Sequence, residues 1–221
     1  MAEKPIGRIL KAIARHLNAG GLVWSKEMMM QWEKVKSDPF KSLIGTVLSQ
    51  RTRDENASLA AERLFARYST PQDLAKASLR EIEKMIKPCG FYKVKARCIR
   101  KISKILIEKY KGRVPDSMEE LCSLPGVGRK TAGCVMVYSY NKPQIPVDTH
   151  VHRISNRIGL VKTKTPEQTE QELMKIMPKK YWIIVNELFV QFGKKVCRPI
   201  GPEHERCPVR KYCNFYKNLR E

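Results

Sequence analysis

Long apolar runs are missing from this sequence, and their absence argues against proteins that cross a membrane with helices. No stretch approaches the roughly 18 apolar residues that a membrane-spanning helix needs, so we expect no membrane span. The N-terminal segment MAEKPIGRILKAIARHL mixes Lys and Arg into its apolar pattern, and it lacks the continuous apolar core of a signal peptide. A transit peptide would also be basic and amphipathic, but Glu3 and the scarcity of serine argue against one. We therefore predict an intracellular protein, in which structural disulfides are disfavoured.

A convincing strand pattern is also missing, as are long linkers, low-complexity runs and repeats of solenoid period. The segment VMVYSY is partly β-branched, but its flanks favour a helix. Helical spacing of apolar residues recurs along the chain instead. It is clear in the first helix (Ile6, Ile9, Leu10, Ile13, Leu17) and in PFKSLIGTVLSQRT (Phe40, Leu43, Ile44, Val47, Leu48). The sequence therefore predicts an all-α fold.

Acidic residues are scarce. The chain has 22 Asp and Glu against 43 Lys and Arg, which gives a net charge of +21. Such an excess suits a polyanionic partner, because phosphates bound by clustered cations release their counterions. A basic surface that is merely solvated is the alternative, so charge alone favours nucleic acid only modestly.

The seven cysteines fall into two groups. Four are scattered among apolar residues, and we expect them to be small core residues or inert thiols: Cys89, Cys98, Cys122 and Cys134. The other three, Cys197, Cys207 and Cys213, crowd the C-terminus, where their spacing suggests a metal site.

The segment LPGVGRKT, residues 124–131, places two glycines just before a predicted helix. Gly126 and Gly128 lack a Cβ atom, so their backbone can turn sharply and approach another surface closely. The helix would begin near Arg129, and its unpaired N–H groups would then point out of the turn toward a phosphate. A plain connection between two helices is the alternative, and it would be preferred for an isolated pair of glycines.

Several motifs together resemble the endonuclease III family of helix-hairpin-helix DNA glycosylases and AP lyases. The resemblance runs from about residue 36 to the end, in the family's order and spacing, through DPFKSLIGTVLSQRTRDENA, IKPCGFYKVKA, KGRVP, LPGVGRKTA, VDTHVHRISNR and the C-terminal cysteines. It implies two helical lobes around a DNA-binding cleft. One would be a helical barrel with the hairpin, residues 32–142. The other would combine residues 1–31 and 143–221 and carry the metal-cluster loop, 197–213.

The resemblance assigns the catalytic lysine to Lys130 and the catalytic aspartate to Asp148, which would lie where the lobes meet. The chemistry is coherent, because an amine can attack the sugar C1′ and form a Schiff base that permits β-elimination. A nearby carboxylate can stabilise the cationic sugar and assist proton transfer. The alternatives are an exposed cation for Lys130 and a helix N-cap for Asp148, although Asp148 could do both.

The predicted DNA contacts come from three places. Gly126, Gly128 and Arg129 would hold a backbone phosphate at the hairpin. Gln50 and Arg51, with Thr52, end a helix where the family places residues that fill the gap left by the flipped base. Arg198 and Arg206, with Arg210 and Lys211, would face the DNA backbone from the metal loop. The alternative for these side chains is simple solvation, and His150 receives no role.

The family's metal pattern is C-x6-C-x2-C-x5-C, which binds a [4Fe-4S] cluster. This chain has His204 where the second cysteine belongs, between Cys197 and the pair Cys207 and Cys213. Imidazole can replace thiolate on iron, so we predict a cluster with three cysteine ligands and one histidine. A Cys3His zinc site ranks second, and loss of the metal ranks third.

The resemblance therefore predicts a bifunctional enzyme of base excision repair. It would excise oxidised pyrimidines of the thymine glycol type from damaged double-stranded DNA, as a monomer, and cleave 3′ to the abasic site. Two alternatives stay open at this point: a monofunctional mismatch or uracil-type glycosylase, and a non-catalytic DNA-binding protein.

Overall fold

The computed structural model describes residues 5–19 and 38–219 of the chain. Every regular element among them is a helix, which confirms the predicted all-α class. The chain divides into two compact units, residues 36–142 and residues 1–35 together with 143–221. The predicted lobe boundary between residues 31 and 32 lies outside the described residues, and the lobes with their cleft stay a prediction. No helix in the described ranges is long and apolar enough to cross a membrane.

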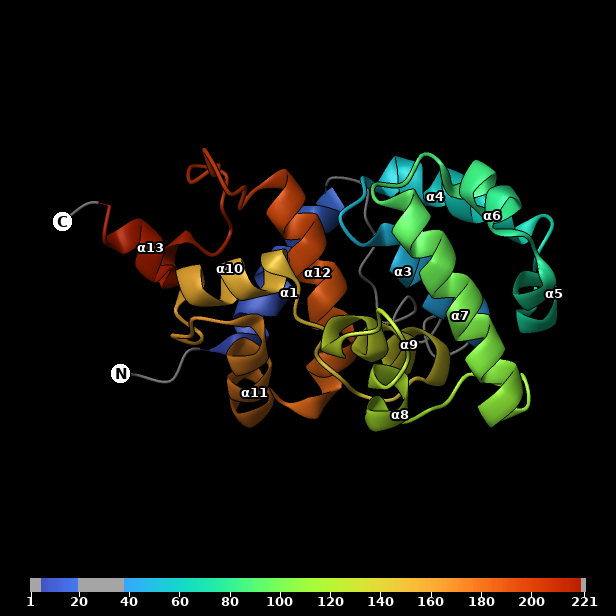
Figure 1. Ribbon diagram of the computed structural model, residues 1–221. Coiled ribbons are helices and arrows are strands. Elements are labelled where there is room, and N and C mark those ends of the chain that lie inside the picture. The colour runs from blue at the N-terminus through green and yellow to red at the C-terminus, as the bar shows by residue number, and fades with distance from the viewer. Residues whose placement is uncertain (1–4, 20–37, 220–221) are drawn as a thin grey trace. The chain divides into compact units, whose positions relative to one another are not determined.

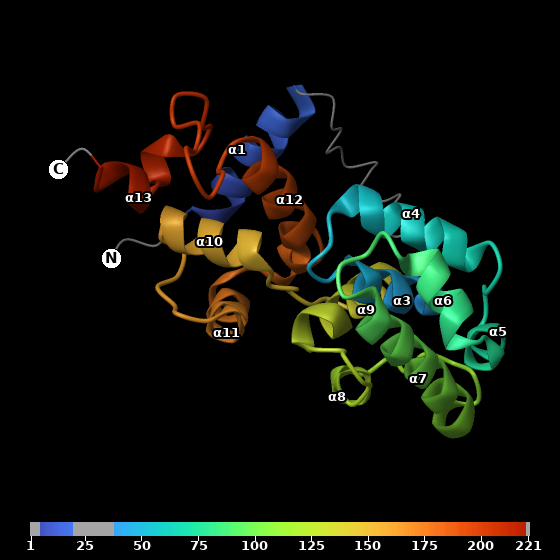
Figure 2. The ribbon, with the colours of Figure 1, turned by 45° about the horizontal axis from the view of Figure 1, so that its top comes forward.

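The unit of residues 36–142 is built around α3, which packs against α4, α7 and α9 (Figures 1 and 2). Its helices are α3 (Pro39–Ser49), α4 (Asp54–Phe65), α5 (Pro71–Lys76), α6 (Leu79–Ile86), α7 (Tyr92–Tyr110), α8 (Met118–Cys122) and α9 (Arg129–Tyr140). The predicted apolar stripe of α3 is buried in the core of this unit. Burial of one face of each helix is the main stabilising term, because helices this short are marginal alone.

Local sequence sets the helix starts in this unit. Asp38 accepts a hydrogen bond from the Lys41 N–H, and Pro39 fills the first turn of α3. Ser78 and Glu81 form a capping box at the start of α6, where each side chain accepts from the other residue's backbone N–H. These caps satisfy N–H groups that the helix itself leaves unpaired.

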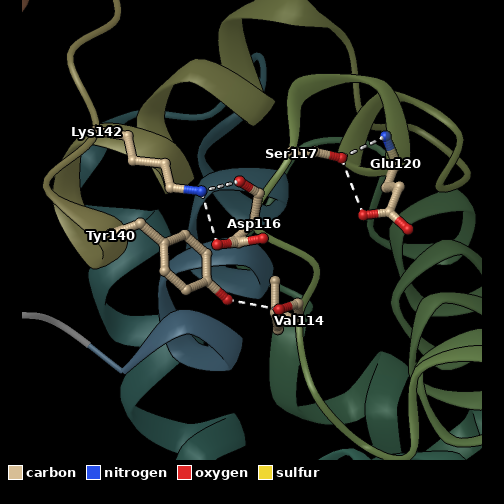
Figure 3. Close-up of polar contacts among 6 residues, drawn as sticks. All are labelled: Val114, Asp116, Ser117, Glu120, Tyr140 and Lys142. Atoms are coloured by element: carbon tan, nitrogen blue, oxygen red, sulfur yellow. Dashed lines mark hydrogen bonds and ion pairs between the residues drawn. The ribbon is translucent and has the colours of Figure 1, made fainter.

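Figure 3 shows how α9 is tied at its C-terminal end to the segment that enters α8. The Tyr140 hydroxyl donates to the Val114 carbonyl at 2.5 Å. The Lys142 ammonium donates to the Asp116 carbonyl at 2.7 Å and to its carboxylate at 2.6 Å. Because α8 and α9 flank the glycine turn, these contacts fix the base of the helical hairpin opposite that turn.

The second unit places α12 beside α1 and α10, as both views show. Its elements are α1 (Ile6–Ala19), α10 (Thr149–Ile158), α11 (Pro166–Ile176), the 3-10 turn η1 (Lys179–Tyr181), α12 (Trp182–Lys195), the 3-10 turn η2 (Arg210–Tyr212) and α13 (Asn214–Lys217). The five apolar residues predicted for the first helix are buried in this core, which confirms an amphipathic N-terminal helix.

The scattered cysteines behave as the sequence predicts. Cys89 and Cys134 are buried, Cys98 and Cys122 are partly buried, and no disulfide joins any of the seven cysteines.

Candidate active site

The turn between α8 and α9 is held from inside by two apolar side chains. Leu124 and Val127 are only 2% and 5% exposed, and the Val127 N–H donates to the Leu124 carbonyl at 3.2 Å. Gly126 adopts a positive φ of 70°, and a Cβ atom there would lie 2.6 Å from the Cys98 sulfur. Both the backbone angle and the close approach of α7 therefore require glycine at residue 126.

Gly128 and Arg129 face outward, where α9 begins. Gly128 is exposed and takes the N-cap position of α9. Apart from its chain neighbours, none of the described atoms lies within 4 Å of a Cβ built on it. Glycine has no side chain with which to cap the first N–H groups of the helix, so this end offers backbone donors and the positive end of the helix dipole. Lys130, partly exposed, is the second residue of α9.

Gln50 connects the end of α3 to the hairpin. Its side-chain amide donates to the Gly126 carbonyl at 2.9 Å and lies 3.1 Å from the Thr131 hydroxyl. The sequence predicts that Gln50 helps to fill the gap left by the flipped base. The structure shows an additional contact with the hairpin, which spacing alone did not indicate. Gln50 holds the end of α3 and the glycine turn at a fixed separation.

Arg51 and Phe91 line one hollow on the surface, together with Gln50, Val94 and Lys95. Both Arg51 and Phe91 have a left-handed backbone, with φ values of 50° and 57°. Such angles in residues other than glycine often occur at functional sites. Phe91 and Val94 are large apolar residues that are 64% and 56% exposed. Helical spacing did not single out either residue, although an aromatic residue directly after Gly90 in a family motif was a usable signal.

Asp148 is the N-cap of α10. One carboxylate oxygen accepts hydrogen bonds from the His150 and Val151 N–H groups, both at 2.8 Å. The capping role that the sequence allowed for Asp148 is therefore present, and the carboxylate is held in a fixed orientation and partly exposed. Asp148 belongs to one compact unit and Lys130 to the other.

Two of the three C-terminal thiols contact Arg157. The Arg157 guanidinium lies 3.6 Å from the Cys197 sulfur, and the Cys213 thiol donates to the Arg157 carbonyl at 3.2 Å. Burial is the main reason that the pKa of the Cys207 thiol rises to about 11, and the Cys213 and Cys197 thiols also raise that pKa. The sequence pattern has therefore brought three sulfur donors into one neighbourhood.

His204 lies against aromatic rings. Its ring centroid is 5.1 Å from that of Tyr216 and 6.0 Å from that of Phe215. Within the described part of the chain, no group of three or more His, Cys, Asp or Glu side chains is arranged to hold a metal ion. Ligation by His204 stays a prediction.

Three arginines of the loop 197–213 pair with carboxylates of the same loop. Arg198 and Arg206 both contact Glu203, at 3.3 and 3.2 Å, and Arg210 contacts Glu205 at 2.9 Å. Exposed pairs of this kind contribute little to stability, so a phosphate could compete for these guanidinium groups. Their predicted contact with DNA stays a prediction.

Comparison with known proteins identifies the family. Residues 44–179 match the family model of the HhH-GPD superfamily base excision DNA repair proteins. Endonuclease III of Thermotoga maritima is 54% identical over 82% of this chain and 85% of its own length. Endonuclease III of Bacillus subtilis is 37% identical over 82% of this chain and 83% of its own. The chain therefore belongs to the HhH-GPD superfamily and, within it, to the endonuclease III family.

Two solved structures share the whole fold. A non-covalent endonuclease III–DNA complex and a trapped endonuclease III–DNA covalent intermediate each superpose with a TM-score of 0.86 and 35% identity. In both cases the match covers 100% of each chain. A thermostable thymine-DNA glycosylase, 24% identical with a TM-score of 0.80, shares the fold.

Proposed function

We propose that this protein is a bifunctional DNA glycosylase and AP lyase of base excision repair. It excises oxidised pyrimidines from duplex DNA and cleaves the strand 3′ to the resulting abasic site. The observation that carries the proposal is the helical hairpin, whose rigid glycine turn places Lys130 in the first turn of α9. Endonuclease III relatives, one of them trapped covalently on DNA, support it.

The Lys130 amine is the nucleophile. Its Nζ atom forms a bond to the sugar C1′ while the bond from C1′ to the damaged base breaks and the base leaves with its electron pair. Ring opening then gives an imine between Nζ and C1′. Loss of a proton from C2′ sends electrons toward the imine, and the bond from C3′ to the phosphate oxygen breaks.

Asp148 assists from the N-terminus of α10. Its carboxylate stabilises positive charge that develops on the sugar and takes part in the proton transfers. The two backbone N–H groups that it accepts from hold it in place, so little reorganisation is needed when charge develops.

The hairpin binds the DNA backbone beside the lesion. The N-terminal N–H groups of α9 and the exposed Gly128 offer a phosphate both hydrogen-bond donors and a favourable dipole. Arg129, Arg198 and Arg206 add sequence-independent attraction, which predicts a steep loss of affinity as salt rises.

The side chains of Gln50, Arg51 and Phe91, which line the hollow, fill the gap that the extruded base leaves in the duplex. Extrusion costs stacking and pairing energy, and apolar side chains inserted into a duplex offset part of such a cost. Phe91 is exposed, large and planar, so it suits stacking between the flanking bases.

The C-terminal loop holds a [4Fe-4S] cluster through Cys197, His204, Cys207 and Cys213, and the cluster fastens this loop. The donor set fits, because thiolate and imidazole both ligate iron in such clusters. The Cys197 and Cys213 thiols both contact Arg157, and both lie close enough to Cys207 to raise its pKa.

Iron, sulfide and zinc analysis of anaerobically purified protein tests the cluster. The proposal predicts about four irons and four sulfides per chain for the unmodified protein and for His204→Cys, with a lower content for His204→Ala. Zinc without sulfide would replace the cluster by a Cys3His zinc site. A protein that contains neither iron nor zinc would show that this loop binds no metal cofactor.

Separate assays of base release and strand cleavage on a thymine glycol duplex test the activity. The proposal predicts both products. Base release without cleavage would indicate a monofunctional glycosylase, and binding without either product would indicate a DNA-binding protein.

A further inference from the structure

Lys95 is a buried lysine on α7 whose ammonium group is fully used. The residue is only 6% exposed. Its Nζ atom donates to the Leu48 carbonyl at 2.7 Å, to the Gln50 carbonyl at 2.6 Å and to the Thr52 hydroxyl at 2.8 Å. These three acceptors match the three donors of an ammonium group, so the side chain is locked in one position.

All three acceptors lie where α3 ends. The last carbonyls of a helix have no intrahelical partner and carry the negative end of the dipole. An ammonium group satisfies them, but burying one is costly. Glycine or asparagine is the usual means of ending a helix, and here Gln50 and Arg51 follow α3. A buried lysine therefore points to a need for a particular backbone path after Ser49.

That backbone path is unusual. Arg51 has a φ of 50°, a backbone conformation that residues other than glycine rarely adopt. Gly90 packs so closely against it that a Cβ atom on Gly90 would lie 2.9 Å from the Arg51 carbonyl oxygen. Residues 50–52 are thus held between the buried ammonium of Lys95 and the backbone of Gly90.

The same segment reaches both the hairpin and the hollow. The Gln50 carbonyl accepts from Lys95, while its side-chain amide donates to the Gly126 carbonyl. Gln50 and Arg51 line the hollow together with Phe91. Lys95 therefore lies at the base of the hollow and is joined through one residue to the turn that precedes Lys130.

We propose that Lys95 is a positioning residue for the flipped state of DNA. It holds Gln50, Arg51 and Thr52 in the one backbone conformation from which the side chains that line the hollow can fill the gap left by the extruded nucleotide. This inference rests on the proposed function. It differs from a purely structural role in one respect: removing Lys95 impairs reactions that require extrusion from a duplex more than reactions that do not.

Lys95→Met tests the proposal against Lys101→Met, which removes an exposed lysine from the same helix. Two substrates are compared: a duplex with thymine glycol, and a single-stranded oligonucleotide with an abasic site, where there is no base pair to open and no opposite strand to support. Base release from the duplex is expected to fall roughly 10- to 100-fold with Lys95→Met, because small misplacements carry such costs. Lyase activity on the single strand and both activities of Lys101→Met should stay within about twofold.

A fluorescent base supplies an independent readout. With 2-aminopurine opposite the lesion and protein at saturation, unmodified protein and Lys101→Met should unstack the probe and raise its fluorescence. Lys95→Met should raise it less at the same saturation. An equal rise would overturn the positioning role, as would an equal loss of the two activities or no loss of either.

Thr52→Val keeps the proposal testable if Lys95→Met does not fold. It removes one of the three acceptors and leaves the two carbonyls for Lys95. A selective loss on the duplex, smaller than that expected of Lys95→Met, supports the inference, and an unchanged ratio of the two activities contradicts it. If unmodified protein acts on neither substrate, the proposed function itself has failed.

Discussion

The guanidinium of Arg153 faces the ring of His150. Nη2 of Arg153 lies 3.1 Å from Nδ1 of His150, and His150 follows Asp148 by two residues. A guanidinium only donates hydrogen bonds, so this contact favours the tautomer in which Nδ1 accepts and Nε2 carries the proton. Arg153 is itself anchored, because its Nη2 and Nε atoms donate to the Cys197 carbonyl at 2.9 and 3.2 Å.

We therefore predict one tautomer for His150. In long-range 15N–1H spectra of protein with labelled histidine, His150 should show a protonated Nε2 and an unprotonated Nδ1 near neutral pH. Arg153→Met should release Nδ1 and allow mixed tautomers or protonation, while the signals of His16 stay unchanged. A protonated Nδ1 in the unmodified protein would contradict the assignment.

Gly193 on α12 leaves room for the side chains of His150 and Arg153, which belong to α10. A Cβ atom at residue 193 would lie 2.3 Å from Nδ1 of His150 and 2.9 Å from Nη2 of Arg153. We expect Gly193→Ala to lower the free energy of unfolding by about 1–3 kcal/mol through overpacking. Urea denaturation measures this change.

Gly45→Ala is the matched control for Gly193→Ala. Gly45 lies inside α3, and apart from its chain neighbours and the backbone of its own helix no described atom falls within 4 Å of a Cβ atom built on it. This substitution should raise the free energy of unfolding by about 0.5–1 kcal/mol, since alanine is the better helix former. A similar effect of both substitutions would show that packing at Gly193 is not the cause.

Because of Tyr140, the free energy of unfolding should depend on pH in the alkaline range. Burial, with Asp116 and Asp38 as further causes, raises the pKa of Tyr140 to about 12. The unfolded value is about 10. A raised folded pKa favours the neutral phenol in the folded state, so its stabilisation is complete below pH 10 and is lost as pH rises toward 12.

Tyr140→Phe tests this dependence by urea unfolding at pH values of about 8 and 11.5. At the lower pH the unmodified protein should be more stable than the variant by about 1 kcal/mol, because the hydrogen bond to Val114 is lost. The difference should shrink at the higher pH. A constant difference would contradict the raised pKa.

The two roles of Asp148 are separable. Asparagine caps helices as well as aspartate does, so Asp148→Asn should change the free energy of unfolding by less than about 0.5 kcal/mol. Asp148→Ala should lower it by about 0.5–2 kcal/mol. Both variants should lose base release by about 10²–10⁴-fold, because the carboxylate is gone. Full activity of the stable Asp148→Asn would limit Asp148 to capping.

Much of the fold follows from local sequence. The apolar stripes of α1 and α3, the cap at Asp38 and the capping box at Ser78 are signals within a few residues of each other, and the structure contains each of them. The turn at Gly126 is also local, since both its φ and its flanking apolar anchors can be read from LPGVG.

The contacts that complete the site are not local. Lys95 meets residues 43 to 47 positions away, and Gln50 meets Gly126 at a separation of 76. Helical spacing makes Lys95 one more lysine on a basic helix, and only packing shows that it is buried. His204 illustrates a different difficulty. Its spacing predicts a metal ligand, whereas its ring lies against Tyr216 and Phe215.

Borohydride trapping on a duplex with an abasic site tests the central claim most directly. Reduction of an imine leaves a stable covalent protein–DNA adduct, so unmodified protein and Lys101→Gln should both give the adduct. Lys130→Gln should give none while keeping its fold and its affinity for the duplex within a fewfold. An adduct of undiminished yield with Lys130→Gln would contradict Lys130 as the nucleophile, and the absence of any adduct from folded, metal-loaded protein would contradict the lyase mechanism.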